Sequence, residues 1–335
     1  MTEVKDNAKS LESQLRPKSL DEYIGQVKVV KSLRLFVNAV KKRGIATEHI
    51  LLYGPPGIGK TTLANIIAIE LEGELKVTSG PAIVKTGDLA AILTNLKDHD
   101  VLFIDEIHRL PKPVEEALYP VMEDFALDII IGKGPSARTM RLPVPKITIV
   151  GATTRLALLS SPLRDRFGML LRLDFYDREE MAEIIIRSSQ ILGVKVSREI
   201  AKKIAARSRR TPRIANRILK RTRDLYEVNR LTKVSEETID ELFQILEIDS
   251  VGLTDIDKKY LKSIIEKFEG GPVGVSTLAS ALSEDVQTIE EYVEPYLLRI
   301  GFIKKTPRGR VATRKGYEHL GVTFKHESDE QSKLI

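Results

Sequence analysis

Residues 49–73, HILLYGPPGIGKTTLANIIAIELEG, decide the fold class of this 335-residue chain. Residues 54–61 match the pattern G-x-x-x-x-G-K-[ST], and the apolar run 49–53 before them predicts a strand. The apolar residues that follow have helical spacing, and Gly73 is the expected end of that helix. Backbone N–H groups of a glycine loop can surround phosphate oxygens, and the dipole of the next helix favours the same negative charge. The stretch therefore predicts a phosphate-binding site.

The side chains of this loop predict ATP and Mg²⁺ as cofactors. Lys60 would reach the β and γ phosphates, and the Thr61 hydroxyl would hold Mg²⁺. The other nucleotide contacts expected here are Gly57, Gly59 and Thr62.

Two further apolar runs predict strands that end in polar residues. VLFIDE (101–106) reads as a buried parallel strand whose Asp105 would bind Mg²⁺, while Glu106 would orient or deprotonate the attacking water. ITIVGATTR (147–155) ends in Thr153 and Thr154, where a hydroxyl could sense the γ-phosphate. Polar residues at the carboxyl ends of buried parallel strands are typical of α/β proteins, which bind their ligands at that edge of the sheet. The predicted fold class is therefore α/β.

Composition excludes several kinds of site and suggests a partner. There are no cysteines, which excludes disulfides, a thiol nucleophile and a cysteine zinc site. The first ten residues lack an apolar core and no run approaches the length of a membrane span, so we expect a cytoplasmic protein. Between Glu199 and Asp224 there are ten Lys or Arg and no acid, and between Glu294 and Glu318 there are seven. Such stretches fit either a solvated face or a polyanion partner.

The order of these motifs resembles the AAA+ ATPases, and within them the RuvB family. The stretches that carry the resemblance are LRPKSLDEYIGQ (15–26), the phosphate loop, VLFIDEIHRL (101–110), GATTR (151–155), SPLRDRFG (161–168), TPRIANR (211–217) and GGPVG with EPYLLRIGFIKKTPRGR (270–310). The resemblance runs from Leu15 to Gly321. It implies an ATP-driven motor for branch migration of Holliday junctions in recombination and repair. That motor would act on duplex DNA as a ring, expected to be hexameric, with RuvA as partner.

The resemblance also assigns residues that spacing alone does not. Arg166 is implied as an arginine finger that acts on the ATP of the neighbouring subunit. Arg164, two residues earlier, could instead form an ion pair within its own subunit. Arg213 is implied to contact the phosphates, although Arg210 stands where the family usually has glycine. Leu15, Arg16 and Tyr176 are implied to line the nucleotide pocket. Glu123, Asp124 and Phe125 match positions at the nucleotide-bearing subunit interface.

We expect three domains and a tail. An AAA+ large domain would cover residues 1–174, with a protruding hairpin near 127–145 that docks on RuvA, and a helical lid would cover 175–250. In the lid, Thr211 is the predicted N-cap and Pro212 the first residue of a helix. A winged-helix domain would cover 251–325, and 326–335 would be a disordered tail.

The winged helix is predicted from three helices and a β-hairpin. Ser276 is the expected cap of the second helix, and Pro295 is expected to kink the third. That third helix carries Glu290, Glu291 and Glu294, which argues against base reading. The wing carries Lys304, Lys305, Arg308 and Arg310, and we expect a sequence-independent grip on phosphates, with Lys305, Arg308 and Arg310 as DNA contacts.

Two other functions are compatible with parts of the sequence. A clamp-loader-like ATPase would share the phosphate loop, but the chain lacks the Ser-Arg-Cys finger because it has no cysteine. A winged-helix regulator could use ATP only to switch its DNA affinity. Glu106 and Arg166 argue against it, since a switch does not need hydrolysis.

Overall fold

The computed structural model describes residues 14–44, 48–131 and 138–324. The chain forms two compact units, of which the first comprises Met1–Ala205 with Arg210–Asp224 and the second Ala206–Arg209 with Leu225–Ile335. Residues 132–137 of the predicted hairpin and the tail predicted at 326–335 lie outside the described residues. Within the part of the chain that the structure describes, no helix combines the length and apolar composition that crossing a bilayer requires.

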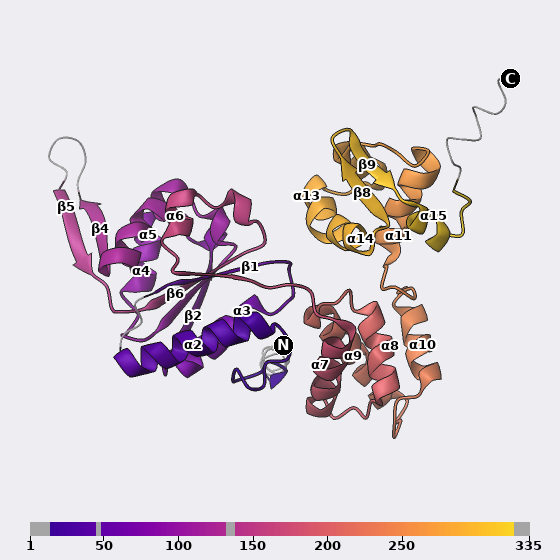
Figure 1. Ribbon diagram of the computed structural model, residues 1–335, viewed down its shortest axis with the longest axis horizontal. Helices are drawn as coiled ribbons and strands as arrows, with labels where there is room; N and C mark the ends of the chain where they lie inside the picture. The colour runs from indigo at the N-terminus through magenta and orange to yellow at the C-terminus, as the bar shows by residue number, and fades with distance from the viewer. Residues whose placement is uncertain (1–13, 45–47, 132–137, 325–335) are drawn as a thin grey trace. The chain divides into compact units, whose positions relative to one another are not determined.

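The first unit contains a five-stranded parallel sheet with the strand order β2-β3-β6-β1-β7 (Figure 1). The three strands predicted from apolar runs, β1, β3 and β6, are its adjacent inner strands, and β1 and β6 are paired in register from Ile50 with Val150 to Tyr53 with Thr153. Both faces of inner parallel strands are covered, which explains why these runs are apolar without alternation. The strands are β1 (Ile50–Tyr53), β2 (Leu75–Ser79), β3 (Val101–Asp105), β6 (Thr148–Thr153) and β7 (Met169–Arg172).

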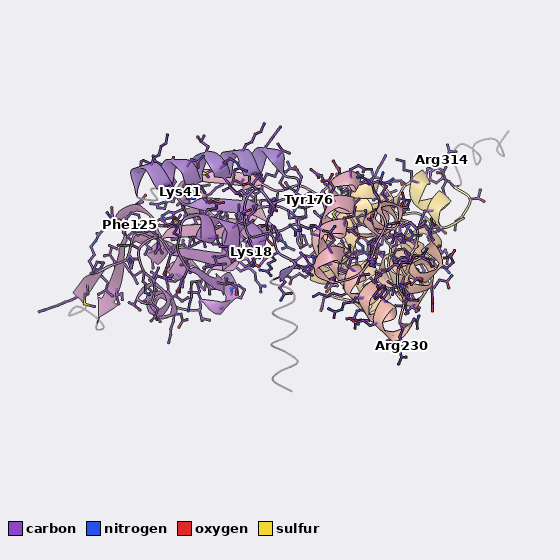
Figure 2. All side chains as sticks on the ribbon, turned by 90° about the horizontal axis from the view of Figure 1, so that it is seen from below. Lys18, Lys41, Phe125, Tyr176, Arg230 and Arg314 are labelled. Carbon is purple, nitrogen blue, oxygen red and sulfur yellow. The ribbon has the colours of Figure 1, made fainter. Side chains whose placement is uncertain are left out.

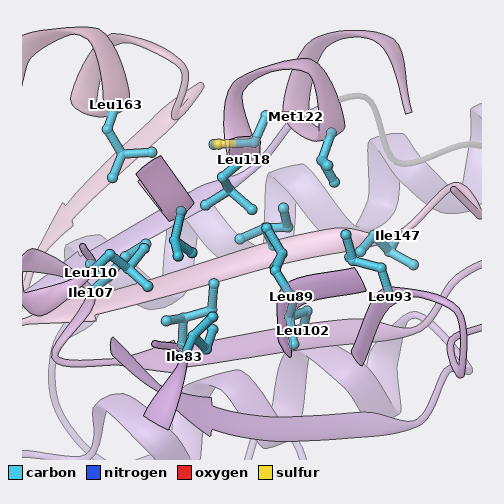
Figure 3. Close-up of a cluster of buried hydrophobic side chains, with 14 of the residues drawn as sticks. Ile83, Leu89, Leu93, Leu102, Ile107, Leu110, Leu118, Met122, Ile147 and Leu163 are labelled. Atoms are coloured by element: carbon cyan, nitrogen blue, oxygen red, sulfur yellow. The ribbon is translucent and has the colours of Figure 1, made fainter. Parts of the chain in front are cut away.

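Helices cover both faces of this sheet. On one face a buried cluster joins Leu102 and Ile149 of the strands to side chains such as Leu89 and Leu118 of the helices (Figure 3). Elsewhere on this unit, α2 packs against α3, and the Lys41 ammonium lies 3.0 Å from the Glu70 carboxylate. Figure 2 shows Lys41 on the surface of this unit. The helices are α2 (Val27–Arg43), α3 (Lys60–Glu70), α4 (Thr86–Leu93), α5 (Lys112–Asp124) and α6 (Ser161–Asp165), with 3₁₀ turns η1 (Gly80–Ala82), η2 (Ile107–Arg109) and η4 (Leu156–Leu158).

The predicted hairpin is a separate two-stranded sheet. β4 (Ala126–Ile131) pairs with β5 (Arg138–Pro143) in antiparallel register, which confirms the two strands expected from the sequence. A protruding hairpin would expose the three isoleucines at 129–131 as an apolar patch. This expectation is wrong for Ile129, which is partly buried and packs against the core cluster because its strand starts directly at the end of α5. The side chains of Ile130 and Ile131 lie outside those described. Met140, on the opposite strand, is 41% exposed.

The region that follows β7 is helical, as predicted. Helix α9 begins at Pro212, and the Thr211 carbonyl accepts its first intrahelical hydrogen bond, from Ala215 N–H at 3.2 Å. Pro212 costs the helix nothing at this position, because the first N–H of a helix has no partner. The helices are α7 (Arg178–Ile191), α8 (Arg198–Arg207), α9 (Pro212–Val228) and α10 (Glu236–Ile245); α7 lies wholly in the first unit and α10 wholly in the second.

Arg210 occupies a backbone conformation that suits glycine. Its φ is +56°, and that of Arg209 is +49°. A residue with a Cβ is destabilised by about 1 kcal/mol or more in this left-handed region, whereas glycine, which the resemblance implies for this position, is not.

We therefore expect Arg210→Gly to raise the free energy of unfolding by about 0.5–1 kcal/mol, because relief of the left-handed strain exceeds the added freedom of the unfolded chain. Chemical denaturation of the full chain would measure it. Arg210→Ala, which removes the side chain but keeps the Cβ, is the matched control and should bring no such gain. Equal stabilisation by both variants would show that the side chain, and not the backbone, is responsible.

The winged-helix part of the second unit has the predicted three helices and wing. The third helical stretch passes through a π-type segment, η6, which ends two residues before Pro295, and the proline has no N–H to donate within the helical ladder. The expected cap at Ser276 is wrong: helix α12 starts at Val275, with Gly274 in the N-cap position. The elements are α11 (Asp255–Lys262), η5 (Ser263–Lys267), α12 (Val275–Leu282), α13 (Val286–Thr288), η6 (Ile289–Val293), α14 (Glu294–Ile300), β8 (Ile303–Thr306), β9 (Gly309–Ala312) and α15 (Arg314–His319).

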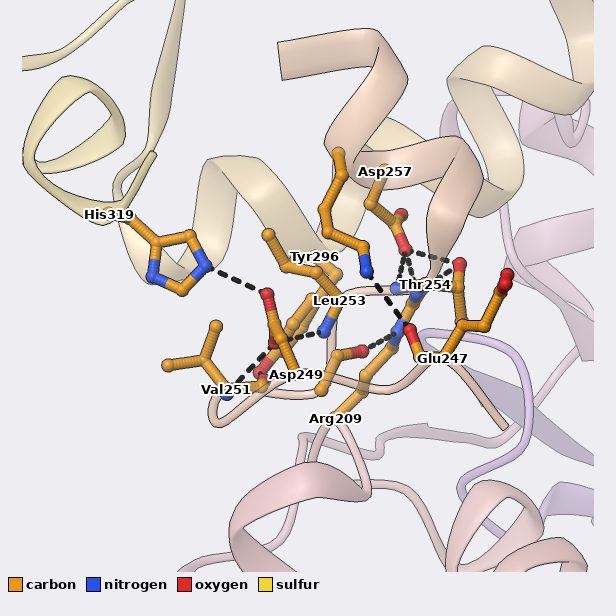
Figure 4. Close-up of polar contacts among 11 residues, drawn as sticks. Arg209, Glu247, Asp249, Val251, Leu253, Thr254, Asp257, Tyr296 and His319 are labelled. Carbon is orange, nitrogen blue, oxygen red and sulfur yellow. Dashed lines mark hydrogen bonds and ion pairs between the residues drawn. The ribbon is translucent and has the colours of Figure 1, made fainter. Parts of the chain in front are cut away.

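A polar cluster anchors residue Arg209 inside the second unit (Figure 4). Its guanidinium pairs with the fully buried Asp257 at the start of α11 and donates to the Gly252 carbonyl at 2.9 Å. Beside it, His319 of α15 lies 2.8 Å from Asp249. Because buried charges require partners, these contacts fix the loop 249–254 that leads into the winged helix.

Candidate active site and DNA-binding surface

The predicted phosphate-site residues meet at the carboxyl edge of the sheet. β1 leads into the phosphate loop, β3 ends at Asp105 and β6 ends at Thr153. The Gly54 N–H donates to the Thr153 carbonyl at 3.1 Å, so the loop starts beside the end of β6. Gly54 and Thr153, which are 99 positions apart along the chain, are thus brought to one edge.

The phosphate loop has the backbone that its glycines allow. Gly57 and Gly59 have φ values of +77° and +105°, and a Cβ on Gly59 would lie 2.7 Å from the Tyr23 hydroxyl. The Lys60 ammonium donates to the carbonyls of Gly54 and Pro55, both at 2.9 Å. Burial lowers the pKa of Lys60 to about 8, opposed by the nearby Asp105 and Glu106 carboxylates and reinforced by the positive charge of Arg213. Lys60 is therefore within electrostatic reach of three other predicted site residues.

Arg213 lies against the phosphate loop. Its N–H donates to the Gly57 carbonyl at 3.3 Å, and its Cβ would be 3.0 Å from a Cβ placed on Gly57. The helix predicted to carry a phosphate-contacting arginine therefore begins at the loop itself. A guanidinium at this position can form charge-assisted hydrogen bonds with the oxygens of a bound polyphosphate.

A hollow beside the loop gathers the residues expected to line a nucleotide pocket. The Tyr23 and Tyr176 hydroxyls are 2.9 Å apart, and both lie within 3.4 Å of the Ile58 carbonyl. Burial raises the pKa of Tyr176 to about 12, so both groups stay neutral hydrogen-bonding groups. The hollow is lined by Leu15, Arg16, Pro17, Tyr23, Ile24, Gly59, Thr62, Tyr176, Ile184, Arg187, Pro212 and Asn216.

Arg187 is a member of this hollow that the sequence did not single out. It donates to the Leu15 carbonyl at 2.7 Å and to the Glu22 carbonyl at 3.0 Å, and burial lowers its pKa. It thereby ties the segment before α2 to helix α7. Nothing in its local sequence distinguishes Arg187 from the other arginines of helical faces.

The acids and threonines at the ends of β3 and β6 offer oxygen ligands and a base. The Glu106 N–H donates to the Asp105 carboxylate at 3.0 Å, and Thr61 lies half-buried in the first turn of α3. A hydroxyl and a carboxylate suit Mg²⁺, which takes its remaining ligands from water and phosphate. Among the described residues no group of three or more His, Asp or Glu side chains is spaced to hold a metal. Thr154, half-buried, directly follows β6.

Arg166 is held in place by residues of α5. Its guanidinium carbon lies 4.2 Å from the centre of the Tyr119 ring, and its Nε lies 3.1 Å from the Glu123 carboxylate. Glu115, Tyr119 and Glu123 are spaced four apart and so share one face of the helix. Ser160, which caps α6, donates to Glu115 on that face. Two residues earlier, Arg164 lies 3.8 Å from Asp165, with 38% of its side chain exposed.

The other residues expected at the subunit interface continue from α5. Asp124 pairs with Arg141 on the hairpin, and Phe125 has a φ of +51° where the helix ends. The Phe125 ring packs edge-on against His49, whose pKa burial lowers to about 4. Of these three residues, Glu123 contacts the predicted finger Arg166, whereas Asp124 contacts the hairpin and Phe125 contacts His49.

The wing separates its four cations into two environments. Lys304, Lys305 and Arg308 are exposed, with the Lys305 ammonium 3.8 Å from Glu290. The expectation that Arg310 lies exposed on the wing is wrong, since it is only 7% exposed. Its guanidinium donates to both carboxylate oxygens of Glu294, at 2.6 and 3.0 Å, and to Glu290 at 3.1 Å. A fork already filled by two carboxylates is a poor phosphate ligand.

Comparisons with known proteins identify relatives over nearly the whole chain. Residues 15–173 match the Holliday junction DNA helicase RuvB P-loop domain, 176–249 the RuvB AAA lid domain and 250–321 the RuvB C-terminal winged helix domain. A solved structure described as the Thermotoga maritima RuvB Holliday junction branch migration motor is 50% identical, with a TM-score of 0.84 over 93% of this chain and 100% of that one. Two single-substitution variants of that protein match at 50% identity with TM-scores of 0.86 and 0.85, each over 93% of this chain and 99% of theirs.

This chain belongs to the RuvB family. Its members are Holliday-junction helicases of the AAA+ class, so a clamp-loader-like ATPase and an ATP-switched regulator are not favoured. RuvB membership also implies that the phosphate loop binds nucleotide. The fold class expected from the sequence, a P-loop sheet domain followed by a helical lid and a winged helix, is confirmed.

Proposed function

We propose that this chain hydrolyses ATP with Mg²⁺ at the carboxyl edge of its five-stranded sheet and uses the energy to drive branch migration of Holliday junctions. The observation that carries this proposal is the convergence of Lys60, Asp105, Glu106 and Arg213 around one phosphate loop. The function itself is that of the RuvB family to which the chain belongs.

Each side chain then has a role in the reaction. Gly57, Gly59, Lys60 and Thr62 would cradle the phosphates, and Leu15, Arg16 and Tyr176 would hold the base. Thr61 and Asp105 would hold Mg²⁺, which when bound would neutralise charge on the phosphates. Glu106 would act as base toward the attacking water, while Thr154 and Arg213 would respond to the γ-phosphate.

Assembly and partners complete the proposal. Arg166 would act on the ATP of a neighbouring copy, with Glu123, Asp124 and Phe125 at that interface. Action in trans requires a ring or an open helical array, and we propose a hexameric ring. RuvA would dock on the β4–β5 hairpin, whose Met140 is 41% exposed, and the motor would work in the cytoplasm. Lys305 and Arg308 would grip DNA phosphates.

We expect Lys60→Ala and Asp105→Asn each to lower ATP turnover by about 100-fold or more, because the first removes the ammonium that would reach the phosphates and the second removes the carboxylate that would hold Mg²⁺. Steady-state hydrolysis on duplex DNA at saturating Mg²⁺ would measure this. Thermal unfolding should stay close to that of the unaltered protein. Near-normal hydrolysis by either variant would remove the site assignment.

A further inference from the structure

His108 lies between the proposed base and the end of β6, although the sequence assigned it no role. Its Nε2 is 3.4 Å from a carboxylate oxygen of Glu106, and its Nδ1 is 2.9 Å from the Thr153 hydroxyl. Only 6% of the His108 side chain is exposed, against 35% for Glu106. The imidazole therefore links a buried hydroxyl to a carboxylate that faces the site.

The hydrogen-bond directions in this chain of groups are consistent with one arrangement. The Arg155 N–H donates to the Thr153 hydroxyl oxygen at 2.9 Å, and the hydroxyl can donate its own proton to His108 Nδ1 at 2.9 Å. A neutral imidazole that accepts at Nδ1 carries its proton on Nε2, where it faces Glu106. These contacts connect the Arg155 backbone, through the Thr153 hydroxyl and the His108 imidazole, to the Glu106 carboxylate.

The backbone around His108 is shaped to present it in this way. Glu106 has a φ of +48°, which turns the chain at the end of β3 into the short helix η2. Gly80 permits that turn, since a Cβ there would lie 2.5 Å from the Glu106 carbonyl oxygen. Ile107, which is fully buried, anchors the turn between the two side chains. A non-glycine residue such as Glu106 adopts left-handed backbone angles only when the surrounding structure holds it there, and such residues are common at functional sites.

We propose that His108 is a positioning residue for ATP hydrolysis, holding the Glu106 carboxylate toward the attacking water and linking it to the β6 end that carries Thr153 and Thr154. The inference rests on the proposed role of Glu106 as base. A base is effective only when it lies within hydrogen-bond reach of the proton it takes, and hydrogen bonds that are long without substrate tighten when it binds. At 3.4 Å, the His108–Glu106 contact has room to tighten.

Three substitutions separate the two contacts of the imidazole. His108→Asn keeps an acceptor near Nδ1 but loses the reach to Glu106, whereas His108→Gln keeps a donor near Nε2. His108→Ala removes both. We expect Asn and Ala to lower kcat by about 10- to 100-fold, with KM for ATP within about twofold, and Gln to recover a substantial part of kcat. A purely structural role would not give rescue by Gln alone.

Thr153 and a neighbouring arginine supply the remaining variants. Thr153→Val should lower kcat by a smaller factor, and adding it to His108→Ala should cost little more, since both act through one contact. Arg109→Ala, an exposed residue of the same turn, is the matched control and should retain normal turnover. Thermal unfolding of each variant would verify that the fold is intact.

The outcomes distinguish this inference from the proposed function. Glu106→Gln is measured beside the histidine variants. If Glu106→Gln is inactive while His108→Ala keeps kcat within twofold, His108 is not a positioning residue and the role of Glu106 stands. If KM rises as much as kcat falls, His108 serves nucleotide binding and the inference is overturned. Near-normal turnover by Glu106→Gln would remove the proposed base and this inference with it.

Discussion

Arg166→Ala is expected to lower DNA-stimulated ATP turnover by about 10³- to 10⁵-fold while ATP binding is retained. A guanidinium neutralises charge that develops on the γ-phosphoryl oxygens, and Arg166 is already held by the Tyr119 ring and the Glu123 carboxylate. A side chain fixed before reaction loses little freedom when it acts. Steady-state hydrolysis and equilibrium binding of a fluorescent ATP analogue would measure the two effects separately.

Mixing tests whether Arg166 acts on a neighbouring copy. Arg166→Ala combined with the inactive Lys60→Ala should regain some turnover, because some interfaces then pair an intact loop with an intact finger. Absence of recovery, with co-assembly demonstrated, would count against action in trans. Arg164→Ala is the matched control. Arg164 lies near Asp165 on the surface, so Arg164→Ala should lower ATP turnover by less than about tenfold. A larger loss for Arg164 than for Arg166 would exchange their roles.

Arg310→Ala is expected to lower the free energy of unfolding of the second unit by about 3–5 kcal/mol. The substitution leaves Glu294, 2% exposed, as a buried carboxylate whose remaining described hydrogen bond comes from the Tyr260 hydroxyl at 2.7 Å. Removing one partner of a buried ion pair costs far more than the pair contributes. Denaturant unfolding of the full chain, followed by a probe in the winged helix, would measure the loss.

A substitution on the same hairpin distinguishes support of the wing from contact with DNA. Arg308 is exposed at the turn, so Arg308→Ala should leave stability unchanged. It should weaken binding to every duplex sequence alike and reduce the slope of log affinity against log salt by about 0.9. Arg310→Ala at a temperature where the unit stays folded should keep that slope. A slope reduced by Arg310→Ala instead, with stability intact, would make Arg310 the phosphate contact.

The sequence alone determined the elements whose chemistry is local. The phosphate loop is one continuous stretch, and its glycines provide the backbone angles that its function needs. The strand ending at Asp105 and the helix starting at Pro212 also follow from consecutive residues, since burial pattern and capping act over a few positions. Leu15 and Tyr176 were found only through resemblance, because residues so far apart meet only after folding.

The tertiary structure decided which side chains pair. Lys305 and Arg310 are directly opposite each other in the wing, so both project to the face that meets Glu290. Only the packing of that face against the third helix buries Arg310 and leaves Lys305 exposed, and no local pattern specifies it. The same holds for His108, whose partner Thr153 arrives on a strand 45 residues later. Local propensity fixes where a strand or turn forms, whereas the neighbours of a side chain depend on which surfaces the whole chain brings together.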